Sequence, residues 1–259
     1  MVELKTDTSI DAMYEAGQVV AQALTAVRKA ADVGVSLREL DEVAREVLSG
    51  AGATSPFLGY RPSFASTPFP AVICASVNDA IVHGIPTGYR LRDGDLVSID
   101  CGAELGGWAG DSAISFVVGT ARPADVRLVA TAERALAAGI GAAVVGNRIG
   151  DIAHAIGSVC RAGGYGIMDD FGGHGIGRRM HEDPPVPNEG RPGRGLRLWH
   201  GMVLAIEPML IAGGEDAYHV APDGWTLCTN DGSRAAHTEH TVAITDAGPR
   251  VLTAREEAL

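Results

Sequence analysis

The stretch that organises this chain is VGVSLREL, residues 33–40. It matches VGNRIGDI, residues 145–152, at a constant offset of 112 residues, and a small-residue pair follows each copy, Ala51-Gly52 and Gly163-Gly164. In the first copy a serine and a glutamate three positions later form the S-x-x-E pattern that opens a helix. The repeat predicts two similar halves, about 9–120 and 121–251. A match this short can also arise by chance in a chain rich in Ala and Gly.

Strand-like segments follow each helical region. The segment Ser9–Ala31 is apolar at helical spacing, and the first repeated stretch opens a second helix that ends near Gly50. The second repeated stretch predicts that a similar helix pair recurs later in the chain. The strand-like runs are Ala71–Ser76, Leu96–Asp100, Ala113–Val118, Met202–Ile211 and Thr238–Thr245. This alternation predicts an α+β fold in which two halves share one sheet. The Pro- and Gly-rich stretches Tyr60–Pro70 and Pro184–Gly195 predict surface loops too short to be domain linkers, so 1–259 is expected to be one domain.

Composition limits the functional classes. The 259 residues are 46% hydrophobic and 20% charged, as expected for a globular protein. A net charge of −11, with Lys5 and Lys29 as the only lysines, argues against a general or sequence-specific nucleic-acid surface. No targeting or membrane-spanning segment is recognisable, which predicts a cytoplasmic protein. The four cysteines are far apart and include no C-x-x-C pair, so we expect reduced, mostly buried thiols.

Carboxylates lie within apolar runs. Asp100, Asp111, Glu207 and Glu239 all have this property. An unpaired charge carried toward a core costs several kcal/mol, and no Arg or Lys stands in the same runs. Two divalent cations would balance four such charges. The alternative readings are that Asp100 ends a strand, that Asp111 caps a turn, and that Glu239 lies on a solvated strand face.

Histidines add possible ligands. His174 lies in Gly172–Gly177, where glycines allow close backbone approach. This is not a dinucleotide loop, because Arg178 takes the place of the third glycine. His181-Glu182 is not a zincin helix, because prolines follow it, and we interpret His181 as facing substrate or supporting the ligands. His83 is a weak signal alone, and no G-x-S-x-G or Cys/His pair suggests a nucleophile.

Together these residues resemble methionine aminopeptidases, over about Ser9–Val251. The motifs are Asp100 with Asp111 eleven positions on, Gly-His174-Gly-Ile-Gly, His181, Ile-Glu207-Pro and Glu239-His-Thr. The short gap between His181 and Glu207, with no N-terminal extension, is similar to the type 1, bacterial enzymes. The resemblance implies the pita-bread fold, a duplicated αβ half with a central antiparallel sheet covered by helices.

The resemblance also implies residue roles. Asp100, Asp111, His174, Glu207 and Glu239 would be metal ligands, with Asp111 and Glu239 bridging two ions. Glu207 would be the general base, and His83 and His181 would contact substrate. The methionine pocket would be lined by Phe57, Tyr60, Phe69, Cys74, Met180 and Trp225, for each of which plain core packing is the alternative. Three residues depart from the usual family pattern: His237 in place of Gln, Met180 in place of Phe, and Glu189 in place of an aromatic residue or His.

The implied activity is removal of the N-terminal methionine from nascent proteins and peptides when the second residue is small, by metal-activated water attacking the first peptide bond. The two divalent ions would be Co, Mn, Fe or Zn. The resemblance implies a monomer that meets nascent chains and leaves open a local contact with the ribosome near the exit tunnel. Two rivals remain: a proline-directed relative, an aminopeptidase P or prolidase, and a metal-free binding protein on the same fold.

Overall fold

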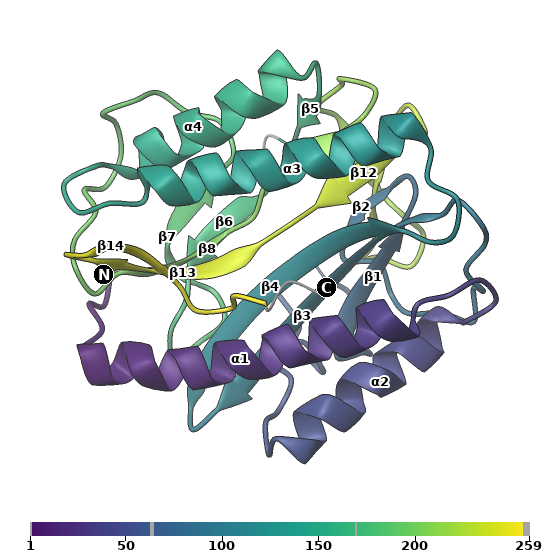
Figure 1. Cartoon of the computed structure of the whole chain (residues 1–259), viewed down its shortest axis with the longest axis horizontal. Helices are drawn as coiled ribbons and strands as arrows, with labels where there is room; N and C mark the ends of the chain where they lie inside the picture. Colours follow the sequence, from purple (N-terminus) through teal and green to yellow (C-terminus); the bar gives the residue numbers. More distant parts are fainter. Residues whose placement is uncertain (1, 63–64, 169, 256–259) are drawn as a thin grey trace.

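Two helix pairs form where the sequence predicts them. The computed structural model describes residues 2–62, 65–168 and 170–255 (Figure 1), so residues 63–64 of the predicted loop Tyr60–Pro70 lie outside the described residues. The helices within the described residues are α1 (Asp7–Ala30), α2 (Leu37–Gly50), α3 (Pro123–Ala142) and α4 (Ile149–Ala162). None of them combines the length and hydropathy of a membrane-spanning segment.

The helices α2 and α4 begin in the same way. Ser36 caps α2 through the predicted capping box, in which its backbone N–H donates to the Glu39 carboxylate at 2.8 Å. At the start of α4 the backbone N–H of Arg148 donates to the Asp151 carboxylate at 2.7 Å. Each of the two N-cap residues, Ser36 and Arg148, also forms an isolated antiparallel bridge to a later segment. The capping predicted from the repeated stretch is therefore confirmed in its first copy and has a counterpart in the second.

The strands of the described residues form four antiparallel groups. The first is β1 (Ile73–Val77), β3 (Leu96–Leu105) and β4 (Trp108–Val117), in the order β1-β3-β4. The largest has the order β14-β13-β8-β6-β7 and comprises β6 (Gly172–Gly175), β7 (Glu182–Pro187), β8 (Val203–Ile206), β13 (His240–Thr245) and β14 (Gly248–Val251). The two small groups contain β2 (Ala80–Val82), β10 (Tyr218–Val220) and β11 (Leu227–Thr229), and β5 (Gly166–Ile167), β9 (Met209–Ile211) and β12 (Ala235–His237).

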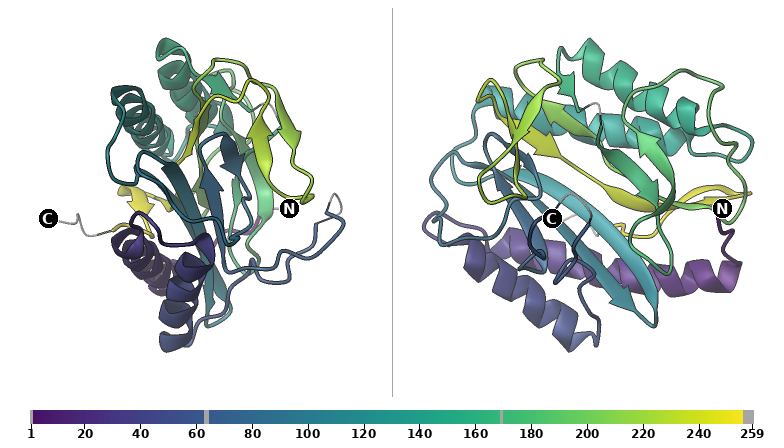
Figure 2. Two further views of the ribbon diagram at one scale, coloured as in Figure 1. Left: turned by 90° about the vertical axis from the view of Figure 1, so that its right-hand side faces the viewer. Right: turned by 180° about the vertical axis from the view of Figure 1, so that it is seen from behind.

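Both helix pairs gather on one side of the strands (Figure 2). One apolar core packs α1 and α2 against β1 and β3, through side chains such as Leu24, Leu40 and Ile99. A second core packs α3 and α4 against β8 and β13, through Leu128, Ile156 and Ile206. Helices on one face of antiparallel sheets confirm the predicted α+β class.

Close approach of α1 to β4 depends on two glycines. A Cβ on Gly110 would lie 3.0 Å from the Cα of Gly17, and a Cβ on Gly17 would meet the Leu252 carbonyl. Only glycine leaves room for these backbones to meet. The contact holds the C-terminal segment and α1 against the strand that carries Asp111.

Two strand predictions need correction. The stretch Pro184–Gly195 is not a loop throughout, because β7 covers Glu182–Pro187. Proline is tolerated there because β7 is the edge strand of its sheet, where a missing N–H breaks no central ladder. The run Leu96–Asp100 does not end at Asp100 either, since β3 continues to Leu105 and pairs with β4 along its whole length.

Candidate metal centre

The hairpin of β3 and β4 supplies two of the predicted ligands. In its register Gly102 lies opposite Asp111 and Asp100 opposite Ala113, so the two aspartates are diagonal neighbours on one face. Their convergence was predicted from the glycines between them. The turn itself falls at Gly106-Gly107, both with positive φ.

The other three predicted ligands come from the five-stranded sheet. His174 is on β6 and pairs with Ala205 of β8, and Glu207 follows directly after that strand. Glu239 immediately precedes β13, which begins at His240. Its backbone N–H donates to the carbonyl of Ala113 on β4 at 3.1 Å. This bond joins the two sheets at the point where the carboxylates meet.

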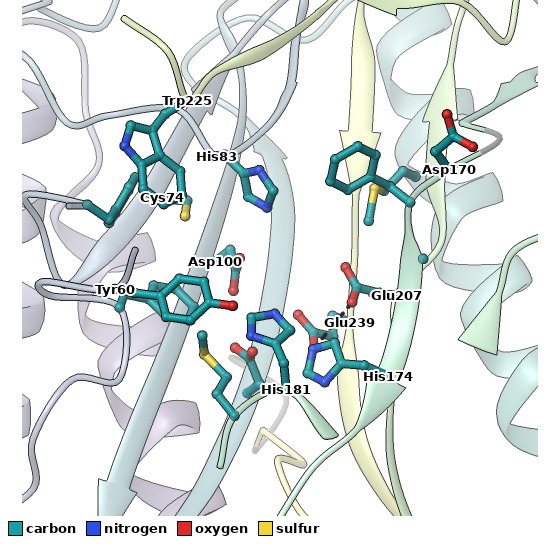
Figure 3. Close-up of a pocket in the computed structure, with 17 residues that line it drawn as sticks. Tyr60, Cys74, His83, Asp100, Asp170, His174, His181, Glu207, Trp225 and Glu239 are labelled. Atoms are coloured by element: carbon teal, nitrogen blue, oxygen red, sulfur yellow. Dashed lines mark ion pairs between the residues drawn. The ribbon is translucent and has the colours of Figure 1, made fainter. Parts of the chain in front are cut away.

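The five side chains face one space (Figure 3). Candidate ligand atoms of Asp111, His174 and Glu239 lie within 4.8 Å of one another, and so do those of Glu207, His237 and Glu239. The Nε2 atom of His174 is 3.6 Å from Oε1 of Glu207. The sequence-predicted set therefore converges, and His237 joins it.

The carboxylates of this cluster lack positive partners. Asp111 and Glu239 are 4% and 2% exposed, and no Arg or Lys of the described chain forms an ion pair with any of the four. Oδ1 of Asp100, Oδ1 of Asp111 and Oε1 of Glu239 have no hydrogen-bond partner. Buried oxygens without partners are what a cation site requires. The solvated-face alternative for Glu239 is thereby excluded.

Burial and mutual repulsion act on the same carboxylates. Burial raises the pKa of Asp100 to about 7, and Glu207 adds to the effect while His237 opposes it. Burial alone raises the pKa of Glu207 to about 8. Burial and neighbouring carboxylates raise the pKa of Asp111 and of Glu239 well above the ordinary values. A divalent cation would reverse this cost by stabilising the ionised forms.

His174 is prepared as a neutral ligand. Its Nδ1 lies 2.9 Å from the Gly175 carbonyl, which can only accept, so Nδ1 carries the proton. Burial, with a smaller contribution from His181, lowers its pKa to about 3. The free electron pair of Nε2 then faces the Glu207 carboxylate. A backbone carbonyl that fixes the tautomer is typical of metal-binding histidines.

His181 and His83 border the carboxylate cluster. The His181 ring centroid lies 4.3 Å from that of His174, and the ring stacks on Tyr60 with centroids 5.2 Å apart. His83 has φ of 60°, a conformation that costs a non-glycine residue roughly 1–3 kcal/mol and persists only where the surroundings hold it. Its buried Nδ1 has no partner, and burial, with His237 and His181 nearby, lowers its pKa to about 4. The weak sequence signal at His83 thus coincides with a strained residue at the site.

An apolar pocket opens beside the carboxylates. Its cavity is about 340 Å³ and includes all thirteen sequence-predicted site residues. Phe57, Phe69, Cys74, Met180 and Trp225 form one buried apolar cluster, and Figure 3 shows Tyr60, Cys74 and Trp225 across the cavity from Glu207 and His174.

Four further residues line the same cavity and were not predicted: Asp170, Phe171, Gly172 and Met209. Phe171 and Met209 stand directly beside motif residues in sequence, which is the one signal that pointed to them. Of the three departures from the family pattern, Met180 lines the cavity, whereas exposed Glu189 pairs with Arg161 at 2.7 Å outside it.

Comparison with known proteins identifies the family of this chain. Residues 11–246 match the model of metallopeptidase family M24. Methionine aminopeptidase 1 of Mycobacterium tuberculosis is 54% identical over 260 residues, which cover 98% of this chain and 95% of the relative. The chain belongs to metallopeptidase family M24, in its methionine aminopeptidase branch. The resemblance read from the sequence is confirmed.

Solved structures of family M24 agree with this assignment. The crystal structure of methionine aminopeptidase from Thermotoga maritima has a TM-score of 0.93 and 38% identity, covering 99% of this chain and all of that one. The pita-bread fold of the family is thus confirmed. Prolidase from Pyrococcus furiosus has a TM-score of 0.76 at 22% identity, which shows a shared fold alone, and this chain spans 66% of it.

Proposed function

We propose that this chain removes the N-terminal methionine from peptides and nascent proteins, with preference for a small second residue. One observation carries the proposal: buried carboxylates with unpartnered oxygens and a neutral imidazole line the same cavity as a cluster of apolar side chains. Membership of the methionine aminopeptidase branch supports the same activity. A metallopeptidase of this kind hydrolyses a peptide bond.

The residues present fit divalent metal ions. Asp100, Asp111, His174, Glu207 and Glu239 would hold the two ions. Four carboxylates balance two dications, and oxygen-rich ligation with imidazole suits Mn, Fe, Co or Zn. When bound, such ions supply Lewis acidity and lower the pKa of water.

The chain's own groups complete the chemistry. Glu207 accepts a proton from the attacking water and returns it to the leaving amine. His181, at the edge of the cluster beside Tyr60, donates a hydrogen bond to the scissile carbonyl, where negative charge develops. His83, whose ring packs edge-on against Phe171 and Trp225, contacts the substrate.

The apolar wall provides specificity. Phe69 packs edge-on against Trp225, with centroids 5.1 Å apart, and Phe57 packs edge-on against Phe69 at 6.5 Å. The indole N–H of Trp225 donates to the Thr67 carbonyl at 3.0 Å, which fixes the ring. An unbranched thioether suits such a pocket because sulfur packs favourably against aromatic edges.

The cellular setting remains part of the proposal. We propose a monomer that acts in the cytoplasm on chains emerging from the ribosome, and any ribosome contact is local because the protein is acidic overall. A proline-directed activity would use the same fold. Substrate choice therefore has to separate the two.

The test measures release of the first residue from Met-Ala-Ser, Met-Leu-Ser and Ala-Pro-Ser. Metal-stripped protein is assayed alone and after addition of Mn(II) or Co(II). We expect metal-dependent release from Met-Ala-Ser, little from Met-Leu-Ser and none from Ala-Pro-Ser. Cleavage of Ala-Pro-Ser would assign the chain to the proline-directed enzymes, and no release with any metal would favour a binding protein.

A further inference from the structure

His237 is a buried imidazole with an unmatched nitrogen. It ends β12, where its backbone N–H donates to the Ser115 hydroxyl at 3.0 Å and its carbonyl accepts from the same hydroxyl at 2.7 Å. Strand pairing with Met209 fixes the backbone from the other side. Only 2% of the residue is exposed, yet Nε2 has no hydrogen-bond partner. Leaving a buried nitrogen unpaired costs about 1–3 kcal/mol unless a ligand meets it.

This nitrogen faces the carboxylates. It lies 3.4 Å from Oε2 of Glu207 and 4.0 Å from Oε2 of Glu239. A charge-assisted hydrogen bond would be shorter, about 2.7–2.9 Å. Two ligand atoms that each lie about 2.1 Å from one ion are instead about 3.0–3.4 Å apart at octahedral or tetrahedral angles. The Glu207 to His237 separation is therefore typical of two ligands of one ion.

The cluster consequently contains two possible ligand trios. Asp111, His174 and Glu239 form one, and Glu207, His237 and Glu239 form the other. Each trio has one imidazole, and the Glu239 carboxylate is common to both. Both imidazoles approach the Glu207 carboxylate, because Nε2 of His174 lies 3.6 Å from Oε1 and Nε2 of His237 lies 3.4 Å from Oε2.

We propose that His237 is a direct protein ligand of one of the two metal ions, so that two imidazoles, those of His174 and His237, serve the two ions. The proposal rests on the proposed function, since both require the same metal centre. An imidazole ligand from His237 favours Fe, Co or Zn over Mn at the ion that it binds, because imidazole is a softer donor than carboxylate. The metal preference of this chain would then depend on His237.

X-ray absorption at the cobalt edge tests the ligand directly. Metal-stripped protein is loaded with two equivalents of Co(II), and the imidazole contribution is counted. We expect one imidazole per cobalt in the wild type and half as much in His237→Gln. His174→Gln should show the same halving. His83→Gln is the matched control, because it removes a buried imidazole near the carboxylates that belongs to neither trio, and its count should stay at the wild-type value.

Calorimetric titration provides a second readout. In His237→Gln one equivalent of Co(II) or Zn(II) should bind at least about tenfold more weakly, with a smaller loss for Mn(II). Free imidazole should restore the cobalt signal in His237→Ala. A wild-type count of half an imidazole per cobalt overturns the proposal, and this holds even if the variants fail to fold.

The experiments distinguish a failure of His237 as a ligand from a failure of the proposed aminopeptidase activity. If wild-type protein releases methionine from Met-Ala-Ser while His237→Gln leaves the cobalt spectrum unchanged, His237 is not a ligand and the function stands. If wild-type protein loaded with metal releases nothing, the function fails. The imidazole count still decides the role of His237 in that case.

Discussion

Replacing Glu207 by Gln removes the proposed general base while keeping the shape of the side chain and one of its oxygens. Gln has nearly the same shape and keeps one carbonyl oxygen beside His174, whose Nε2 lies 3.6 Å from Oε1 in the wild type. Packing within the buried strand ends should therefore be retained. What disappears is a negative charge and the ability to accept a proton.

The expected loss is in turnover. Removing a general base costs about 10²–10⁴-fold in kcat, equivalent to about 2.7–5.4 kcal/mol of transition-state stabilisation. The KM for Met-Ala-Ser should change little, because the apolar cluster that receives the side chain does not include Glu207. The rate is expressed per bound metal ion, since Glu207 is also a proposed ligand.

Steady-state kinetics on Met-Ala-Ser with elemental analysis of each sample provides the measurement. Glu189→Gln is the matched control, because this exposed carboxylate pairs with Arg161 outside the cavity and its loss should cost at most about 1 kcal/mol of stability. Near-wild-type turnover by a fully metallated Glu207→Gln protein would refute the base assignment.

Four further changes test other parts of the site. Asp111→Asn should lose at least one metal equivalent by elemental analysis, and a full complement would contradict its bridging role. His181→Ala should lower kcat by about 10²–10³-fold with metal content unchanged, as for loss of an oxyanion donor, and an unchanged rate would remove it from the reaction. Trp225→Ala should raise the KM for Met-Ala-Ser without loss of metal, whereas an unchanged KM would place it outside the methionine pocket. Gly173→Ala would drive a Cβ into the Ala205 carbonyl, so chemical denaturation should show a loss of about 1–3 kcal/mol, and undiminished stability would argue against this close approach.

Many residues of the candidate site could be predicted from the sequence alone. A carboxylate inside an apolar run, such as Asp100 or Glu207, is anomalous by burial cost alone, and glycines around His174 mark a place where backbones approach closely. The capping box at Ser36 likewise predicts a helix start from local hydrogen bonding. These signals depend on neighbouring residues in sequence.

Other features depended on partners far along the chain. The prolines of β7 looked incompatible with a strand, but its place at the sheet edge removes the penalty. Phe171 and Met209 line the cavity only because β6 and β9 lie where their sheets place them. His237 stood out in sequence as a departure from family pattern, and nothing local indicated that its Nε2 would face Glu207.

The sequence by itself determined which groups must be neutralised: four carboxylates set in apolar segments, with His174 held between glycines. Only the tertiary structure decided which of these groups meet. Asp111 and Glu239 come together because the Glu239 backbone N–H donates to the carbonyl of Ala113, two residues from Asp111 on β4. Every non-proline residue carries the same backbone donor and acceptor, so side-chain identity does not reveal where hydrogen bonds between distant strands form.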